Sequence, residues 1–121
     1  MQEQLFIWKT AERARRPAEG GKMEISCKKQ GGRVVAKLSG ELDHHSAPQA
    51  REALSRAMHK EPAAALVLDM AGVTFMDSSG IGVILGRLKE LQRTGGSLTI
   101  LNPSAQMKKI LKMAGLGDLI G

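Results

Sequence analysis

The spacing of apolar residues changes along the chain, and this change limits the fold more than any other feature. Segments 23–29 and 33–40 alternate apolar and polar residues, which is the period of a half-buried strand. Gly31 and Gly32 lie between them, so we expect an antiparallel hairpin in which both glycines supply positive φ. The compact part of the chain therefore begins with a two-stranded unit.

Helical spacing replaces this alternation after the hairpin. Ser46, with Gln49 three residues later, is a capping-box pattern and predicts the start of a helix. The apolar run at 63–68 predicts a buried strand with cover on both faces or a central position. Further on we expect a helix that begins in 77–79 and ends at Gly95 and Gly96, a strand at 97–101, a helix capped by Ser104, and the start of another strand in 116–121. The side chains expected to face the core are Ala50, Leu54, Ala57 and Met58 in the first helix, Ile81, Ile84, Leu85, Leu88 and Leu91 in the second, and Met107, Ile110, Leu111 and Ala114 in the third.

This order of elements predicts an α/β fold. A strand, a helix and a strand in succession pair in parallel through a right-handed crossover, while the hairpin adds an antiparallel pair. We therefore expect a mixed β-sheet of about four strands, packed by three or more helices. Residues 1–22 have no sustained apolar period and end in a Pro, Glu and Gly-Gly stretch, which predicts a flexible extension joined to one domain at 23–121.

The composition excludes several classes of protein. Aromatic residues make up only 2% of the 121 residues, so stacking platforms for nucleic-acid bases are absent. No apolar run approaches the roughly 20 residues of a membrane-spanning helix, and the lone Cys27 lies in a strand pattern, so we expect a soluble protein of the reducing cytoplasm. The net charge of +6 comes from scattered residues, which favours a solvated surface. Nucleic-acid binding through Lys108, Lys109 and Lys112 is the alternative.

The chemically active residues do not have the spacing of an enzyme or of a cofactor site. Gly80, Gly82 and Gly86 do not match a dinucleotide fingerprint, and no P-loop follows them. The serines lack the nucleophile elbow of a serine hydrolase. His44 and His45 are adjacent and offer no metal-ligand spacing. We therefore expect no catalytic residue, no cofactor and no metal.

Asp77, Ser78 and Ser79 stand at the expected N-terminus of the second helix, where free amides and the helix dipole stabilise negative charge. One of the three residues would suffice as an ordinary helix cap. The additional hydroxyl, with Gly80 and Gly82 leaving room for the backbone of a partner, fits a phosphorylated and recognised surface equally well. The residues alone leave both interpretations open.

Two segments carry a resemblance to a known family. The segments "LSGELDHHSA" at 38–47 and "LDMAGVTFMDSSGIGVILGR" at 68–87, followed by "GGSLTILNPSAQMKKILKMAGLGDLI", resemble the STAS-domain anti-sigma factor antagonists, in particular the anti-sigma F factor antagonists of sporulating bacteria. The similarity extends from Met23 to Ile120. It is specific because these elements occur together and in order around the predicted helices.

The resemblance implies a regulatory switch protein and not an enzyme. In this family the unmodified antagonist binds an anti-sigma factor that is also a serine kinase of the GHKL type, and the sigma factor is released to RNA polymerase. The kinase then phosphorylates the antagonist, the complex dissociates, and a PP2C-type phosphatase reverses the modification. Ser78 aligns with the phosphorylated serine, Ser79 with its unmodified neighbour, and Asp43 with an acid on the partner-facing surface. The residues that we expect to bind the partner are Asp43, His44, Asp77, Ser78, Ser79, Gly80, Ile81 and Gly82.

The chain also departs from the family pattern. It stops at Gly121, where the domain usually continues, so we expect the C-terminal helix of the family to be missing. The extension with Phe6, Ile7 and Trp8 is not part of the pattern. We expect a monomer that binds neither nucleic acid nor membrane. The alternatives are a small nucleotide-binding STAS module and an accessory domain of an anion transporter, because this domain also occurs in those settings.

Overall fold

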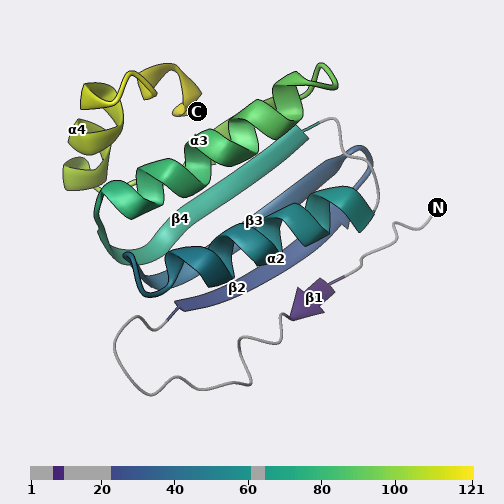
Figure 1. The fold of residues 1–121 in the computed structure, drawn as a ribbon, viewed down its shortest axis with the longest axis horizontal. Coiled ribbons are helices and arrows are strands. Elements are labelled where there is room, and N and C mark those ends of the chain that lie inside the picture. Colours follow the sequence, from purple (N-terminus) through teal and green to yellow (C-terminus); the bar gives the residue numbers. More distant parts are fainter. Residues whose placement is uncertain (1–6, 10–22, 61–64) are drawn as a thin grey trace.

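The computed structural model describes residues 7–9, 23–60 and 65–121. The strands form one sheet in the order β1-β2-β3-β4-β5. Helices α2 and α3 lie side by side along one face of this sheet (Figure 1). The strands are β1 (Ile7–Lys9), β2 (Met23–Gln30), β3 (Arg33–Leu42), β4 (Ala65–Met76) and β5 (Ser97–Leu101), and the helices are α2 (Ala47–Lys60), α3 (Ser78–Gln92), α4 (Ala105–Met113) and the 3-10 helix η1 (Gly117–Leu119).

The predicted hairpin is present and makes the sheet mixed. β2 and β3 pair antiparallel with Gln30 opposite Arg33, whereas β3 with β4 and β4 with β5 pair in parallel. Gly31 has a positive φ of 62°, but Gly32 does not, which corrects the expectation that both glycines supply it. The predicted mixed α/β fold is confirmed, and the short β1 pairs antiparallel with the outer edge of β2.

The hydrophobic core lies between the sheet and the helices. Alternate residues of the hairpin strands are buried in it, among them Ile25, Cys27 and Ala36, so the predicted burial of the lone cysteine is confirmed. Ala53 on α2 has no exposed surface, which lets this helix approach the sheet closely. The predicted inner face of α2 is also confirmed, because Ala50, Leu54, Ala57 and Met58 are all buried.

Strand β4 lies between β3 and β5, in the central position that its apolar run predicts. Leu66, Leu68 and Met70 belong to the core, while Val67 lies outside that cluster and is still only 8% exposed. The strand continues beyond the predicted run to Met76, with register shifts against β3 on the way. This extension brings the end of β4 level with the end of β3.

The predicted C-terminus of α3 and the predicted start of α4 are confirmed. Gly95 takes a φ of 77°, and the Gly96 amide donates to the Leu91 carbonyl at 2.8 Å, which closes the C-terminus of α3. At the start of α4, the Ser104 hydroxyl accepts a hydrogen bond from the Met107 amide at 3.1 Å. Gly95 with Gly96, and Ser104, were therefore reliable boundary signals for these two helices.

Other expectations are corrected. Leu85 of α3 and Ala114 after α4 are exposed, although helical spacing predicted that both face the core. In the segment 116–121, Gly117–Leu119 form the 3-10 helix η1 where the start of a strand was expected. Within it, Ile120 makes a single parallel bridge to Ile100.

Of the predicted N-terminal extension the structure describes only β1; the other residues of 1–22 lie outside the described residues. The domain boundary at residue 23 therefore stays a prediction. Within the described ranges, no helix has the length and apolar character needed to cross a membrane.

Candidate functional site

The carboxyl ends of β3 and β4 meet at one edge of the sheet. Leu42 lies opposite Met76 where these parallel strands end, and just beyond them the Asp77 amide donates to the Leu42 carbonyl at 3.3 Å. Because Asp43 follows Leu42, the two predicted acids leave the sheet at the same edge. Helices α2 and α3 both start from this edge (Figure 1).

Asp77 caps the N-terminus of α3. It has extended backbone angles, φ −118° and ψ −166°, and its Oδ1 accepts a hydrogen bond from the Ser79 amide at 2.8 Å. Ser79 is half-buried, whereas Ser78 is exposed and its hydroxyl makes no hydrogen bond within the described ranges. The cap is thus provided by Asp77, and the Ser78 hydroxyl is accessible to a partner.

Asp43 stabilises the turn that leads into α2. Its Oδ1 accepts hydrogen bonds from the amides of His45 at 3.0 Å and Ser46 at 3.1 Å. Burial acts to raise the pKa of the Asp43 carboxyl, but these amides, the Ser46 hydroxyl and the charge of His45 together outweigh burial and hold the pKa below its ordinary value. The carboxylate is therefore ionised near neutral pH and adds negative charge to the edge that carries Ser78.

Ser46 does not form the predicted capping box with Gln49. Its buried hydroxyl donates to the Glu41 carbonyl at 2.6 Å and accepts from the Asp43 amide at 3.1 Å. None of the side-chain hydrogen bonds in the described part of the chain joins this hydroxyl to the Gln49 amide. The hydroxyl instead links the end of β3 to the residue that precedes α2.

His44 and His45 lie in the same connection, and both are exposed. Their ring centroids are 4.2 Å apart and the rings are tilted by 35°. Among residues 7–9, 23–60 and 65–121, no group of three or more His, Cys, Asp or Glu side chains could hold a metal ion.

The glycines of α3 differ in their surroundings. Gly80 is buried, and a Cβ at this position would lie 2.4 Å from Met76 Cγ and 3.1 Å from Leu42 Cδ2. The expectation that Gly80 leaves room for a partner is therefore wrong, because the protein's own core occupies that room. Gly82 is exposed, with no atom of the described residues within 4 Å of an added Cβ. Ile81 is half-buried and packs against the core.

Two exposed apolar side chains near this edge were not predicted. Phe75, at the end of β4, is 49% exposed, and Leu85 on α3 is 37% exposed. A spacing of seven residues puts Leu85 on the same side of α3 as Ser78, so helical geometry contained the signal for Leu85. Phe75 had no such signal, because β4 extends beyond the apolar run that predicted it.

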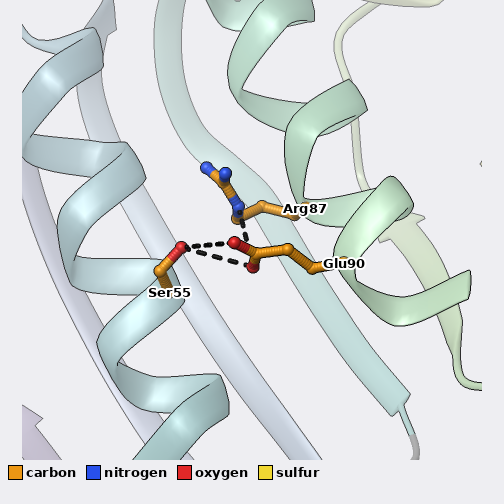
Figure 2. Close-up of polar contacts among 3 residues, drawn as sticks. All are labelled: Ser55, Arg87 and Glu90. Carbon is orange, nitrogen blue, oxygen red and sulfur yellow. Dashed lines mark hydrogen bonds and ion pairs between the residues drawn. The ribbon is translucent and has the colours of Figure 1, made fainter. Parts of the chain in front are cut away.

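A polar network joins α2 to α3 further along the helices. Arg87 is only 6% exposed, and its Nε donates to Glu90 Oε1 at 3.3 Å. The Ser55 hydroxyl of α2 donates to Glu90 Oε2 at 3.1 Å (Figure 2). Arg87 Nη1 is buried without a hydrogen-bond partner in the described part of the chain. Apolar spacing did not predict this buried cation, since a charged residue interrupts the helical pattern.

A shallow groove lies over β2, β3 and β4, away from the candidate site. Its lining contains Lys37, Ser39 and Asp69, but none of the residues predicted to bind a partner. Hydrogen bonds from the Asn102 amide side chain at 3.0 Å and from the Ala71 amide at 3.1 Å lower the pKa of Asp69. The groove is therefore a different site from the edge that carries Ser78, and none of the hydrogen bonds named here joins the two.

Comparison with known proteins shows consistent similarities. Residues 24–121 match the family described as "STAS domain". The chain is 43% identical to the anti-sigma F factor antagonist of Lysinibacillus sphaericus over 84 residues, which cover 69% of this chain and 72% of that protein. The unphosphorylated form of the anti-sigma factor antagonist SpoIIAA superposes with a TM-score of 0.73 and 35% identity over 80% of this chain and 85% of that chain. The phosphorylated form of the Bacillus cell fate determinant SpoIIAA superposes with a TM-score of 0.67 and 36% identity, over 80% of this chain and 88% of that chain.

Proposed function

Because the chain belongs to the STAS-domain family and is an anti-sigma factor antagonist, we propose that phosphorylation of Ser78 decides whether it binds its anti-sigma factor. The protein is a regulator and not an enzyme, and its partner is an anti-sigma factor. In the proposed cycle the unphosphorylated chain binds an anti-sigma factor that is also a GHKL-type serine kinase, and this releases the sigma factor. Phosphorylation then ends binding, and a PP2C-type phosphatase restores it.

The exposed hydroxyl of Ser78 is the observation that carries this proposal. It stands at the N-terminus of α3, while Asp77 already caps the helix through the Ser79 amide at 2.8 Å. A kinase can therefore reach the hydroxyl without opening the fold. Relatives named SpoIIAA have been determined in an unphosphorylated and in a phosphorylated form, which supports the same chemistry here.

The charge of the phosphate accounts for dissociation. A phosphoserine adds about −1.5 to −2 charge at pH 7. Asp43 and Asp77 leave the sheet at the same edge, so the phosphate would join two carboxylates. Burying this charge against a partner that already accommodates those acids costs several kcal/mol unless new cations pair with it. A loss of about 3 kcal/mol weakens binding roughly a hundredfold.

We place the partner on the surface of α3 that continues from Ser78. Gly82 offers open backbone there, and the exposed Leu85 follows on the same side of the helix. Phe75 adds apolar area at the end of β4. Asp43 and His44 complete this surface from the neighbouring connection, with Asp43 available to a basic side chain through its Oδ2.

Native mass spectrometry with the cognate anti-sigma factor tests this proposal. Ser78→Ala should form the complex as the unmodified chain does, whereas Ser78→Asp should form little of it. Ser97→Asp is the control, because it adds the same charge at the exposed start of β5, away from Ser78, and it should bind as the unmodified chain does. Equal complex formation by Ser78→Asp and the unmodified chain would reject the proposed switch.

A further inference from the structure

The two histidines before α2 are not required by the fold. Both rings are exposed, and the hydrogen bonds that hold the connection come from the Asp43 carboxylate and the Ser46 hydroxyl. The rings nevertheless lie close together, with their centroids 4.2 Å apart and their planes tilted by 35°. An exposed pair of imidazoles held together in this way calls for an explanation outside the stability of the connection.

The position of the pair relative to Ser78 suggests that explanation. The hydrogen bond from the Asp77 amide to the Leu42 carbonyl, at 3.3 Å, holds together the ends of the two strands. His44 lies two residues beyond Leu42, and Ser78 lies one residue beyond Asp77. The pair and the serine therefore lie on adjacent connections at the same edge of the sheet (Figure 1).

The charged side chains of the two connections at this edge are acidic apart from the histidines. Around the histidines, β3 and its connection contribute Glu41 and Asp43, and α3 contributes Asp77 at its cap. The first turn of α3 has no charged side chain, and Lys89 in its last turn is about 16 Å further along the helix axis. The cation on the second turn of α2 is the exposed Arg51. A dianion added here would meet the amides at the N-terminus of α3 and, among the charged side chains of the two connections, the carboxylates of Asp43 and Asp77. The exposed Lys108, Lys109 and Lys112 belong to α4, which follows β5 from the same side of the sheet. Within the two connections themselves, an imidazole is the side chain that can supply positive charge.

We propose that the neighbouring imidazoles of His44 and His45 provide a counter-charge for a phosphate on Ser78: after phosphorylation one imidazole takes a proton from the solvent and pairs with a phosphate oxygen. This inference rests on the proposed function, because it requires Ser78 to be the modified residue. Imidazole is the side chain whose charge changes most readily near neutral pH, so a nearby dianion is enough to favour its protonated form.

This pairing also weakens docking of the partner in a second way. In the free, phosphorylated chain the imidazolium and the phosphate lie in water at an exposed edge, so the fold does not have to change to accommodate the modification. On docking, both charges would have to be desolvated together with Asp43 and Asp77. The pair thus stabilises the phosphorylated form only while the partner is absent.

Imidazole NMR titrations of the full chain test the proposal. Phosphoserine is incorporated at position 78 during translation, so that no kinase is needed, and the titration is compared with that of the unmodified chain. We expect the midpoint of His44 or His45 to move to higher pH by about 0.5 to 1. His59, on the last turn of α2 at the opposite end of that helix, should keep its midpoint and is an internal control.

Phosphoserine at the exposed Ser97 is the matched control for position. This residue begins β5, so it lies at the edge of the sheet opposite to Ser78. In the variant H44Q/H45Q the phosphate at residue 78 should titrate at higher pH by ³¹P NMR, because its counter-charge is gone. Unchanged midpoints after modification of Ser78, or an equal change after modification of Ser97, would overturn the proposal.

The same sample separates this inference from the proposed function. If the chain phosphorylated at Ser78 fails to bind the anti-sigma factor but its histidine midpoints do not move, only the counter-charge is rejected. If the midpoints move and binding persists, only the phosphorylation switch is rejected.

Discussion

The Asp77 amide donates a hydrogen bond to the Leu42 carbonyl at 3.3 Å, and this contact holds the ends of β4 and β3 together. Asp43 and Ser78 follow these two residues directly along the chain. The contact therefore brings an ionised carboxylate and an accessible hydroxyl to the same edge of the sheet. Phosphorylation at this edge changes the charge of a surface whose backbone is already fixed.

We predict that the cognate kinase modifies Ser78 and not Ser79. The Ser78 hydroxyl is exposed and unused, whereas Ser79 is half-buried and its amide is held by the Asp77 cap. Ser78→Ala should abolish incorporation of phosphate, while Ser79→Ala should retain it. Phosphopeptide mapping after reaction with the kinase measures this, and phosphate recovered on Ser79 in the unmodified sequence would contradict it.

Gly80 and Gly82 should respond oppositely to the same substitution. Gly80→Ala places a Cβ 2.4 Å from Met76 Cγ, so we expect it to lower the free energy of unfolding by about 1–3 kcal/mol. Gly82→Ala meets open space within a helix and should raise it by roughly 1 kcal/mol. Urea denaturation of both variants measures the difference. Equal effects at the two positions would show that Gly80 does not pack as described.

Substitution of the two partners of the Arg87–Glu90 ion pair should lower the free energy of unfolding by different amounts. Glu90→Ala leaves the 6% exposed Arg87 without its carboxylate, and we expect a loss of about 3 kcal/mol in unfolding free energy. Arg87→Met removes the unsatisfied Nη1 and fills similar space, so its loss should be smaller. Ser55→Ala should cost about 1 kcal/mol. A larger loss for Arg87→Met than for Glu90→Ala, measured by denaturant titration, would contradict this account.

Asp69 makes stability depend on pH in acid. Hydrogen bonds from Asn102 and Ala71 lower the pKa of the Asp69 carboxyl below its ordinary 3.8, so its stabilising effect is complete above about pH 4 and is lost as the pH falls through the folded-state pKa. Asp69→Ala should lower the free energy of unfolding by about 1–2 kcal/mol at pH 7. The difference from the unmodified chain should narrow below pH 4. An equal difference between the two proteins at pH 7 and below pH 4 would contradict this account.

The spacing of apolar residues was sufficient to predict the fold and much of the core. Local signals set the element boundaries: Gly31 at the hairpin, Ser104 at the start of α4, and Gly95 after α3. The sequence did not predict the end of β4, because the residues from Val73 to Met76 do not alternate regularly between buried and exposed positions. Local pattern cannot show where two strands finish level with one another, since that depends on their register.

Side-chain roles at the site depended on packing and were harder to predict. Gly80 and Gly82 are equivalent in the sequence, yet one faces Met76 in the core and the other faces solvent. Ser46 has a capping-box spacing, but the nearby Asp43 carboxylate takes over the turn. Arg87 is a charged residue that is buried by its position against α2. The spacing of apolar residues along the sequence does not indicate such burial.

The affinity of the anti-sigma factor for the chain phosphorylated only at Ser78 tests the central claim most directly. Isothermal titration calorimetry should give a Kd at least about a hundredfold weaker than for the unmodified chain, which corresponds to roughly 3 kcal/mol. Circular dichroism should show the same fold and a similar Tm for the two forms. An unchanged Kd with an intact fold would contradict the claim that charge at this edge of the sheet controls binding.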